Sequence, residues 1–266
     1  MGISVNIMAR DKKLIIGNWK MNLNVHDSSL HLHALSKKVK PHRTVEVVIA
    51  PTMLALQTLS VQVNHRQFKL AAQNFYWRDS GAFTGEVSAT QLRGIVSYGL
   101  VGHSERRHVF HESDKDTRAK VQAALRNDIR PVLCVGETAG ERAAGETRDI
   151  LHDQLLGGLA NVTSEELPKV VIAYEPVWAI GTGDNALPAD VTDAVTSIRR
   201  QLSHLYGTKI ASEVQVLYGG SVTSESAADY LALESIDGLL VGGASLQAES
   251  FANIVERAHK SVKGEA

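Results

Sequence analysis

The chain has 266 residues, of which 44% are hydrophobic, and its 28 basic and 29 acidic side chains leave a formal net charge of −1. A large core is possible, as one large domain or two small ones, and no basic block or stripe indicates nucleic-acid binding. No apolar run approaches the ~20 residues of a membrane span, and the single cysteine, Cys134, cannot form an intrachain disulfide, so we expect a cytoplasmic protein without membrane contact.

Short β-rich runs alternate with longer segments of helical spacing along the chain. Residues 1–12 precede the first run and lack the apolar core of a signal peptide, so we interpret them as a short N-terminal extension. Strands are predicted at residues 14–18, 45–50, 69–73, 98–102, 132–135, 170–174, 214–218 and 238–241. Helices are predicted over residues 31–39, after capping-box patterns at 88–91 and 113–116, and from Pro188 onward.

The alternation of strands and helices favours parallel pairing, because parallel neighbours need crossover connections. Eight βα units in about 250 residues is the size of a closed (β/α)8 barrel. An open doubly wound sheet is the alternative, but residues 17–20 after the first strand read Gly-Asn-Trp-Lys rather than G-x-G-x-x-G. No linker divides the chain. We therefore predict an α/β fold with a single domain over residues 1–266, a closed eight-stranded parallel barrel ringed by helices.

In such a barrel the active site forms at the carboxyl ends of the strands. The polar residues that follow the predicted strands are Asn18, Lys20, Gln73, Asn74, His103, Ser104, Glu105, Glu137 and Glu175. Two of them, Asn18 and Lys20, lie two residues apart and would share a face in extended chain. Each residue alone is more often a structural group or a solvated charge than a catalyst. A lysine, a histidine and a glutamate at one end of one barrel together indicate a catalytic site.

Glycine clusters follow the last two strands, at 219–220 before Ser221 and at Gly242-Gly243. Glycine lets backbone N–H groups approach an anion, and the loops after strands seven and eight of such barrels commonly bind phosphate. Gly242-Gly243 can also open a short helix whose N-terminus favours negative charge. Gly181 with Thr182 could supply a third set of donors. The sequence therefore predicts a small phosphorylated substrate.

Glu175 stands between a buried strand and Pro176, with the apolar residues 177–180 behind it. The proline restricts the direction in which Glu175 leaves the strand, and apolar neighbours would desolvate the carboxylate and strengthen it as a base. The apolar run suits a lid that excludes water, although an ordinary connecting loop is the alternative. A base, a neutral polariser and a cation around a phosphate site suit proton abstraction next to a carbonyl. No metal site and no cofactor are predicted, because His31 and His33 face apart on a helix and no dinucleotide motif is present.

The sequence resembles the triosephosphate isomerase family from about residue 14 to residue 258. The motifs that carry the resemblance are GNWKMN (17–22), AAQN (71–74), GAFTGE (81–86), GHSERRHVF (102–110), CVGE (134–137), YEPVWAIGTG (174–183), YGGSV (218–222) and LLVGGASL (239–246). The resemblance implies an aldose–ketose isomerase of glycolysis and gluconeogenesis. Its reaction would interconvert dihydroxyacetone phosphate and D-glyceraldehyde 3-phosphate through an enediolate.

The resemblance also implies a role for each matched residue. Glu175 would be the proton acceptor and His103 the neutral electrophile, with Lys20 and Asn18 binding substrate and stabilising the enediolate. Gly181, Ser221, Gly242 and Gly243 would bind the phosphate. The supporting residues would be Glu105 as the partner of Lys20, Ser104 beside it, and Tyr218 with Ala186 as a pair that latches the lid.

The chain departs from the family pattern at Asp184-Asn185, where many members carry Lys-Thr, and at His111, where glycine is common. Phe83 and the aromatic residues 75–77 crowd one loop, which predicts a homodimer through residues 74–86. The family resemblance agrees with this interface. Another phosphosugar isomerase or epimerase, or a catalytically inactive binding protein, remain the alternatives, and the intact Lys20, His103 and Glu175 argue against the latter.

Overall fold

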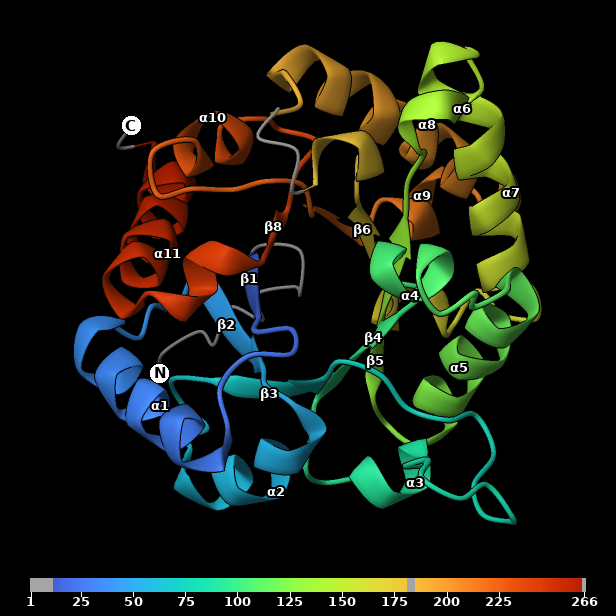
Figure 1. Cartoon of the computed structure of the whole chain (residues 1–266). Coiled ribbons are helices and arrows are strands. Elements are labelled where there is room, and N and C mark those ends of the chain that lie inside the picture. The colour runs from blue at the N-terminus through green and yellow to red at the C-terminus, as the bar shows by residue number, and fades with distance from the viewer. Residues whose placement is uncertain (1–11, 181–184, 265–266) are drawn as a thin grey trace, which may run out of the picture.

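The computed structural model describes residues 12–180 and 185–264 of the chain. Within this part, eight parallel strands pair in sequence order and close into a barrel (Figure 1). The strands are β1 (Lys13–Asn18), β2 (Val45–Ala50), β3 (Lys69–Ala72), β4 (Tyr98–Val101), β5 (Arg130–Val135), β6 (Val171–Tyr174), β7 (Gln215–Tyr218) and β8 (Gly238–Val241). The predicted closed parallel barrel is confirmed, and the open-sheet alternative is wrong.

Closure depends on the pairing of β1 with β8, in which Ile15 lies opposite Leu239 and Gly17 opposite Val241. Gly238 is required for this approach, because a Cβ on it would lie 1.8 Å from the carbonyl oxygen of Leu14. The barrel can therefore close only with glycine at the amino end of β8.

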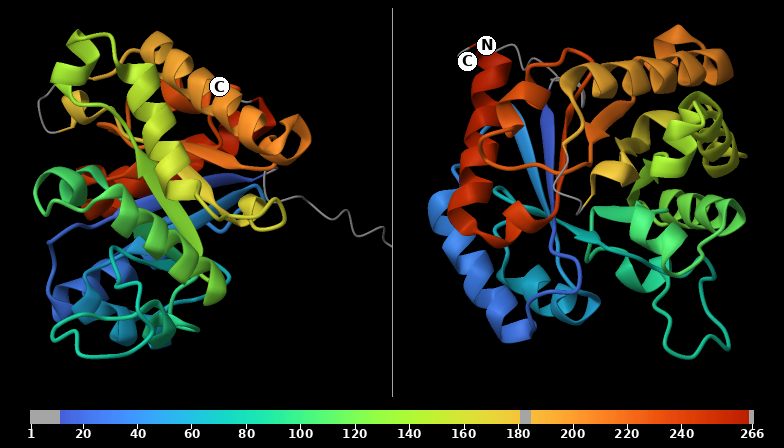
Figure 2. Two further views of the ribbon diagram at one scale, coloured as in Figure 1. Left: turned by 90° about the vertical axis from the view of Figure 1, so that its right-hand side faces the viewer. Right: turned by 45° about the horizontal axis from the view of Figure 1, so that its top comes forward.

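Helices cover the outside of the barrel, as two further views show (Figure 2). They are α1 (Val25–Lys38), α2 (Met53–Gln62), α3 (Ala89–Leu92), α4 (Ser104–His108), α5 (Asp114–Arg126), α6 (Ala139–Ala143), α7 (Thr147–Leu159), α8 (Pro188–Tyr206), α9 (Thr208–Ala211), α10 (Ala227–Leu231) and α11 (Ala248–Lys263). Short 3-10 turns are η2 (Leu167–Lys169), η3 (Val177–Ala179) and η4 (Gly243–Leu246). None of the helices among the described residues is long and apolar enough to cross a bilayer.

The predicted helix starts are confirmed at three places. Ser88 and Ser113 each form a capping box with the residue three positions later, and Pro188 is the first residue of α8. The helix after Ser88 is only four residues long, because Gly94, with a φ of 80°, comes two residues after its end.

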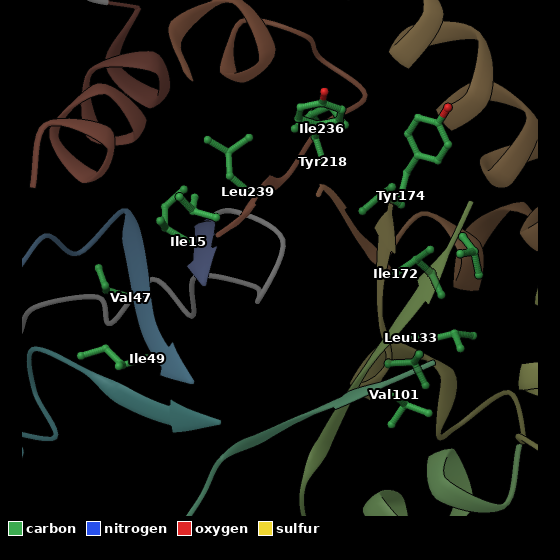
Figure 3. Close-up of a cluster of buried hydrophobic side chains, with 14 of the residues drawn as sticks. Ile15, Val47, Ile49, Val101, Leu133, Ile172, Tyr174, Tyr218, Ile236 and Leu239 are labelled. Carbon is green, nitrogen blue, oxygen red and sulfur yellow. The ribbon is translucent and has the colours of Figure 1, made fainter. Parts of the chain in front are cut away.

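The strands are buried on both faces, since the barrel encloses one core and the helices cover another. Leu14 and Ile16 of β1 point into the barrel with a cluster from the other strands, and Ile15 between them points outward to the helices. Figure 3 shows this outer layer, with Val47 of β2 and Ile172 of β6 among its members. Both faces of each strand are filled with side chains, so substrate must bind at a strand end.

Candidate active site

A cavity of about 700 Å³ opens at the carboxyl ends of the strands. Of the predicted residues, Asn18, Lys20, His103, Ser104, Glu105, Glu175, Ser221, Gly242 and Gly243 line it. Gln73, Asn74, Glu137, Tyr218 and Ala186 are absent from its lining. Gly181, Thr182 and Asp184 lie outside the described residues. Side chains and backbone from strands β1, β4, β6, β7 and β8 thus meet in one cavity.

Lys20 reaches the cavity by a sharp turn of the backbone rather than by a continued strand. β1 ends at Asn18, and Lys20 has a φ of 50°, in the left-handed region. The Asn18 side chain stabilises the turn, because its Oδ1 accepts the Lys20 backbone N–H at 3.0 Å. Asn18 and Lys20 both line the cavity, as expected. The expected cause is wrong, because they do not share a face of extended chain. Lys20 Nζ lies 2.6 Å from Glu105 Oε1.

His103 is held in one tautomer by the backbone that follows it. Its Nδ1 accepts the N–H of Glu105 at 3.2 Å, so in a neutral ring the proton is on Nε2. Nε2 lies 3.0 Å from Glu175 Oε1 and 3.4 Å from the Asn18 amide nitrogen. The imidazole is thus oriented to present an N–H donor to the cavity.

Glu175 follows β6 and is only 2% exposed. One carboxylate oxygen, Oε2, accepts the backbone N–H of Ser104 at 2.8 Å. The other, Oε1, faces His103 but has no partner of good hydrogen-bond geometry among the described residues. The base therefore keeps one oxygen with an unused lone pair at the cavity wall.

The pKa values of this pair shift toward the charged forms. Burial raises the pKa of Glu175, but the His103 contact and the Ser104 N–H outweigh burial and hold the pKa below its ordinary value of 4.5. Burial lowers the pKa of His103, but the Glu175 carboxylate outweighs burial and raises it. The expected effect of the apolar neighbours is present, because burial raises the pKa of Glu175, but the net shift is in the opposite direction. The attraction between Glu175 and His103, together with the Ser104 N–H, reverses the effect of burial.

Two glycines make room for Glu175, and only one of them was expected near the site. A Cβ on Gly136 would lie 1.7 Å from the Glu175 carbonyl oxygen, and one on Gly219 would lie 3.1 Å from its Cγ. Gly219 was predicted as an anion-binding residue, whereas Gly136 was missed as a site residue. The signal that could have found Gly136 is its position directly after β5, in the motif CVGE.

The glycine clusters line the same cavity, and η4 begins at Gly243 as the sequence predicted. Ser245 is fully buried and fastens this turn, because its hydroxyl donates to the Gly242 carbonyl at 2.6 Å. His31 Nε2 lies 2.9 Å from the Ser245 carbonyl oxygen and ties the turn to α1. The Gly242-Gly243 backbone is therefore held in place by contacts within the protein.

Three further predicted residues, Glu137, Tyr218 and Ala186, make contacts outside the cavity lining. Glu137 is fully buried and accepts hydrogen bonds from Tyr174 Oη and Trp178 Nε1. The rings of Tyr218 and Tyr230 stack with centroids 4.1 Å apart, and Tyr230 Oη donates to the Ala186 carbonyl at 2.9 Å. The latch between Tyr218 and Ala186 stays a prediction.

One departure from the family pattern has a structural meaning. His111 has a φ of 55°, in the left-handed region that favours glycine, which explains why glycine is common there.

Residues 12–180 and 185–264 contain no group of three or more His, Cys, Asp or Glu side chains arranged to hold a metal ion.

Comparison with known proteins agrees with this geometry. The family description "Triosephosphate isomerase" matches residues 13–258. The triosephosphate isomerase of Caldanaerobacter subterraneus subsp. tengcongensis is 42% identical over 245 residues, 92% of this chain and 98% of that protein. The Chloroherpeton thalassium enzyme of the same name is 42% identical over 249 residues, 93% and 99% of the two chains. The Streptococcus mutans enzyme is 40% identical over 247 residues, 92% and 98% of the two chains. The chain therefore belongs to the triosephosphate isomerase family.

Proposed function

We propose that this chain is an aldose–ketose isomerase that interconverts dihydroxyacetone phosphate and D-glyceraldehyde 3-phosphate, a step of glycolysis and gluconeogenesis. The observation that carries the proposal is the convergence of Lys20, His103 and Glu175 on one cavity that the glycines at 219–220 and 242–243 also line. A cation, an N–H donor and a carboxylate suit a reaction that creates negative charge on oxygen next to a carbon acid.

Glu175 would begin the reaction by taking a proton from the carbon next to the substrate carbonyl. The C–H electron pair then forms the C=C bond of the enediolate, and the carbonyl π electrons move onto oxygen. His103 Nε2–H and Lys20 Nζ would stabilise that oxygen charge, with Asn18 beside them. His103 Nε2 would then move the hydroxyl proton from one enediolate oxygen to the other, so that the second oxygen becomes the new carbonyl. Returning the proton from Glu175 to the neighbouring carbon completes the isomerisation, and no atom is gained or lost.

Substrate binding would also change the strength of the base. A triose between Glu175 and His103 would separate the pair, and this would remove the contact that lowers the Glu175 pKa. Burial, the largest influence on this group, would then raise the pKa of Glu175 and make it a better proton acceptor. Val177, Ile180 and Leu240 supply the apolar part of the cavity wall that would keep water away.

The phosphate would bind to the backbone of Gly242 and Gly243, with the Ser221 hydroxyl as a further donor. Gly181 is proposed as another donor on the strength of the family motif. One assay tests the function: purified chain with D-glyceraldehyde 3-phosphate, coupled to NADH oxidation by glycerol-3-phosphate dehydrogenase. Turnover is expected. No turnover, with glycerol 3-phosphate still bound, would favour an inactive binding protein or an isomerase of another phosphosugar.

Lys20→Met is expected to weaken both catalysis and anion binding, because one cation serves the developing enediolate and the phosphate. Loss of such a group costs ~10²-fold or more in kcat/KM. Affinity for glycerol 3-phosphate, measured by calorimetry, should fall about tenfold. The matched control is Lys69→Met at the amino end of β3, away from the cavity. Unchanged affinity in the Lys20 variant would contradict this role.

We propose further that the chain forms a homodimer through the loop of residues 74–86. This loop projects from the barrel (Figure 1), and in it Tyr76 stacks on Trp77 and makes a tilted contact with the Phe83 ring. Several large apolar side chains of the first four βα units are exposed, among them Met21, Leu54, Phe83, Val109 and Phe110. So much exposed apolar surface is typical of an interface.

We also propose that the protein works in the reducing cytoplasm, and the buried thiol of Cys134 is consistent with this.

Light scattering at micromolar concentration is expected to give the mass of a dimer. Met21→Asp should shift the mass toward that of a monomer. Met21 is 93% exposed in the single chain, so the charge of the new aspartate would be buried only in a dimer. The control is Val61→Asp, which is 78% exposed on the far end of α2. A monomer mass in an active wild-type sample would contradict the dimer.

A further inference from the structure

The chain that follows Glu175 is braced from outside the cavity. Val177 and Ile180 line the cavity, whereas Trp178 packs against the outer core. The backbone N–H of Val177 donates to the Glu137 carbonyl at 3.1 Å, and Trp178 Nε1 donates to Glu137 Oε1 at 2.9 Å. The direction in which Glu175 leaves β6 therefore depends on how firmly Glu137 and Trp178 are held.

Arg142 contacts both of these residues. It lies on α6, a five-residue helix with a capping box at Thr138. Its guanidinium carbon lies 4.2 Å from the centroid of the Trp178 ring, and Nη1 lies 3.7 Å from Glu137 Oε1. Glu137 is a fully buried carboxylate, and a buried carboxylate needs a cation or strong donors to stay charged. A planar guanidinium can lay its face on an indole while its edge pairs with a carboxylate, whereas an ammonium has no flat face.

The Arg142 side chain also contacts the first turn of α8. Arg142 Nη2 donates to Asp190 Oδ1 at 2.9 Å, and Asp190 Oδ2 accepts the backbone N–H of Leu187 at 3.2 Å. Asp190 thus caps the start of α8 while it pairs with Arg142. One guanidinium therefore connects Trp178, three residues after the base, with the residue that caps α8.

Arg142 does this from outside the cavity, because it is not among the cavity-lining residues. It lines instead a separate polar pocket of about 370 Å³ between α6, α7 and α8, with Arg148 and Asp193. α6 lies beside the start of α8 (Figure 1), in agreement with the Arg142–Asp190 pair. A role in catalysis would therefore be indirect.

We propose that Arg142 is a positioning residue for Glu175, which fixes the Glu175–Ile180 segment by holding Trp178, Glu137 and Asp190 together. This inference rests on the proposed isomerase function. Small displacements of a base cost rate rather than affinity, because they act on proton transfer and leave the phosphate contacts in place. The expected signature is a lower kcat at nearly constant KM.

The test compares Arg142→Met, Arg142→Lys and the control Arg148→Met, which removes a charge from the same pocket on α7. For Arg142→Met we expect kcat to fall about tenfold, with KM and the Kd of glycerol 3-phosphate within about twofold of wild type. Arg148→Met should match wild type. Arg142→Lys should recover only part of the lost rate, because the ammonium cannot stack flat on Trp178.

Several outcomes would overturn the proposal: a kcat for Arg142→Met within twofold of wild type, an equal loss in Arg148→Met, or full recovery in Arg142→Lys. If Arg142→Met does not fold, Asp190→Asn replaces it, since an asparagine keeps the cap and removes one charge. A loss of about two- to fivefold in kcat is then expected, and an unchanged kcat would refute the inference. An inactive wild type would refute the proposed function instead, so the two failures are distinguishable.

Discussion

Replacing Glu175 with glutamine is expected to lower kcat by ~10²–10⁴-fold, because an amide cannot accept the proton that a general base removes. The fold should survive, since the glutamine amide oxygen can still accept the Ser104 N–H that Oε2 accepts at 2.8 Å in the wild type. Substrate affinity should also persist, because the variant leaves the proposed phosphate-binding residues Ser221, Gly242 and Gly243 unchanged. Coupled turnover assays would measure kcat, and unfolding curves on the same samples would measure the stability of the fold.

The same variant makes a second, independent expectation for His103. The Glu175 carboxylate raises the pKa of His103 against the lowering effect of burial. Glu175→Gln removes that charge, so the His103 pKa should fall, which NMR titration of the imidazole would measure. The matched control is Glu46→Gln, because Glu46 lies on β2 near the opposite end of the barrel. A kcat for Glu175→Gln above about a tenth of wild type would show that Glu175 is not the base.

The barrel could be predicted from the sequence because each strand is a short apolar run between recognisable helix starts. The differences are at strand ends and have local causes. β6 begins at Val171 rather than Val170, because the Val170 N–H closes the 3-10 turn η2 onto the Leu167 carbonyl. β5 begins two residues earlier than predicted, at Arg130, whose guanidinium donates to Tyr98 Oη at 2.7 Å. A tertiary contact there overrides a weak strand preference.

The site was predictable where a residue's chemistry is visible in its own type and position, as for Lys20, His103 and Glu175. It was not predictable where the effect depends on a distance between remote segments. The lowered pKa of Glu175 depends on the His103 imidazole and on the backbone N–H of Ser104, which is 71 positions away in the chain. The need for glycine at position 136 depends on how close β5 and β6 approach each other. Residue patterns do not contain such distances.

Glu112 is the other residue that the sequence did not reveal, and the structure predicts a large effect on stability for it. Its side chain is 3% exposed and accepts hydrogen bonds from Arg106 Nε at 2.6 Å and from Lys120 Nζ. Its second oxygen accepts the backbone N–H of Gly102 at 3.2 Å, directly after β4. Lys120 in turn donates to Asn74 Oδ1 at 2.7 Å, at the start of the proposed interface loop. The cluster joins β4, α5 and that loop.

Glu112→Gln is expected to lower the free energy of unfolding by about 3–5 kcal/mol, the usual effect of removing one partner of a buried ion pair. The glutamine fits the space but leaves Lys120, whose pKa burial already lowers, without its carboxylate. The matched control is Asp114→Asn, two residues further along, because its pair with Arg107 is 47% exposed on the aspartate side. An exposed pair of that kind contributes only ~0–1 kcal/mol. Urea unfolding at one fixed protein concentration would measure both, and equal losses would contradict the prediction.

The pH dependence of that difference provides a further check on its cause. Burial raises the pKa of Glu112, but Lys120 and Arg106 outweigh burial and hold it below its ordinary value of 4.5. A carboxyl whose folded-state pKa is lowered contributes stability above its unfolded pKa and loses it as pH falls through the folded value. The stability gap between wild type and Glu112→Gln should therefore be largest near neutral pH and narrow below about 4.5. A gap that stays constant into acid would show that packing, rather than the charge of Glu112, holds the cluster together.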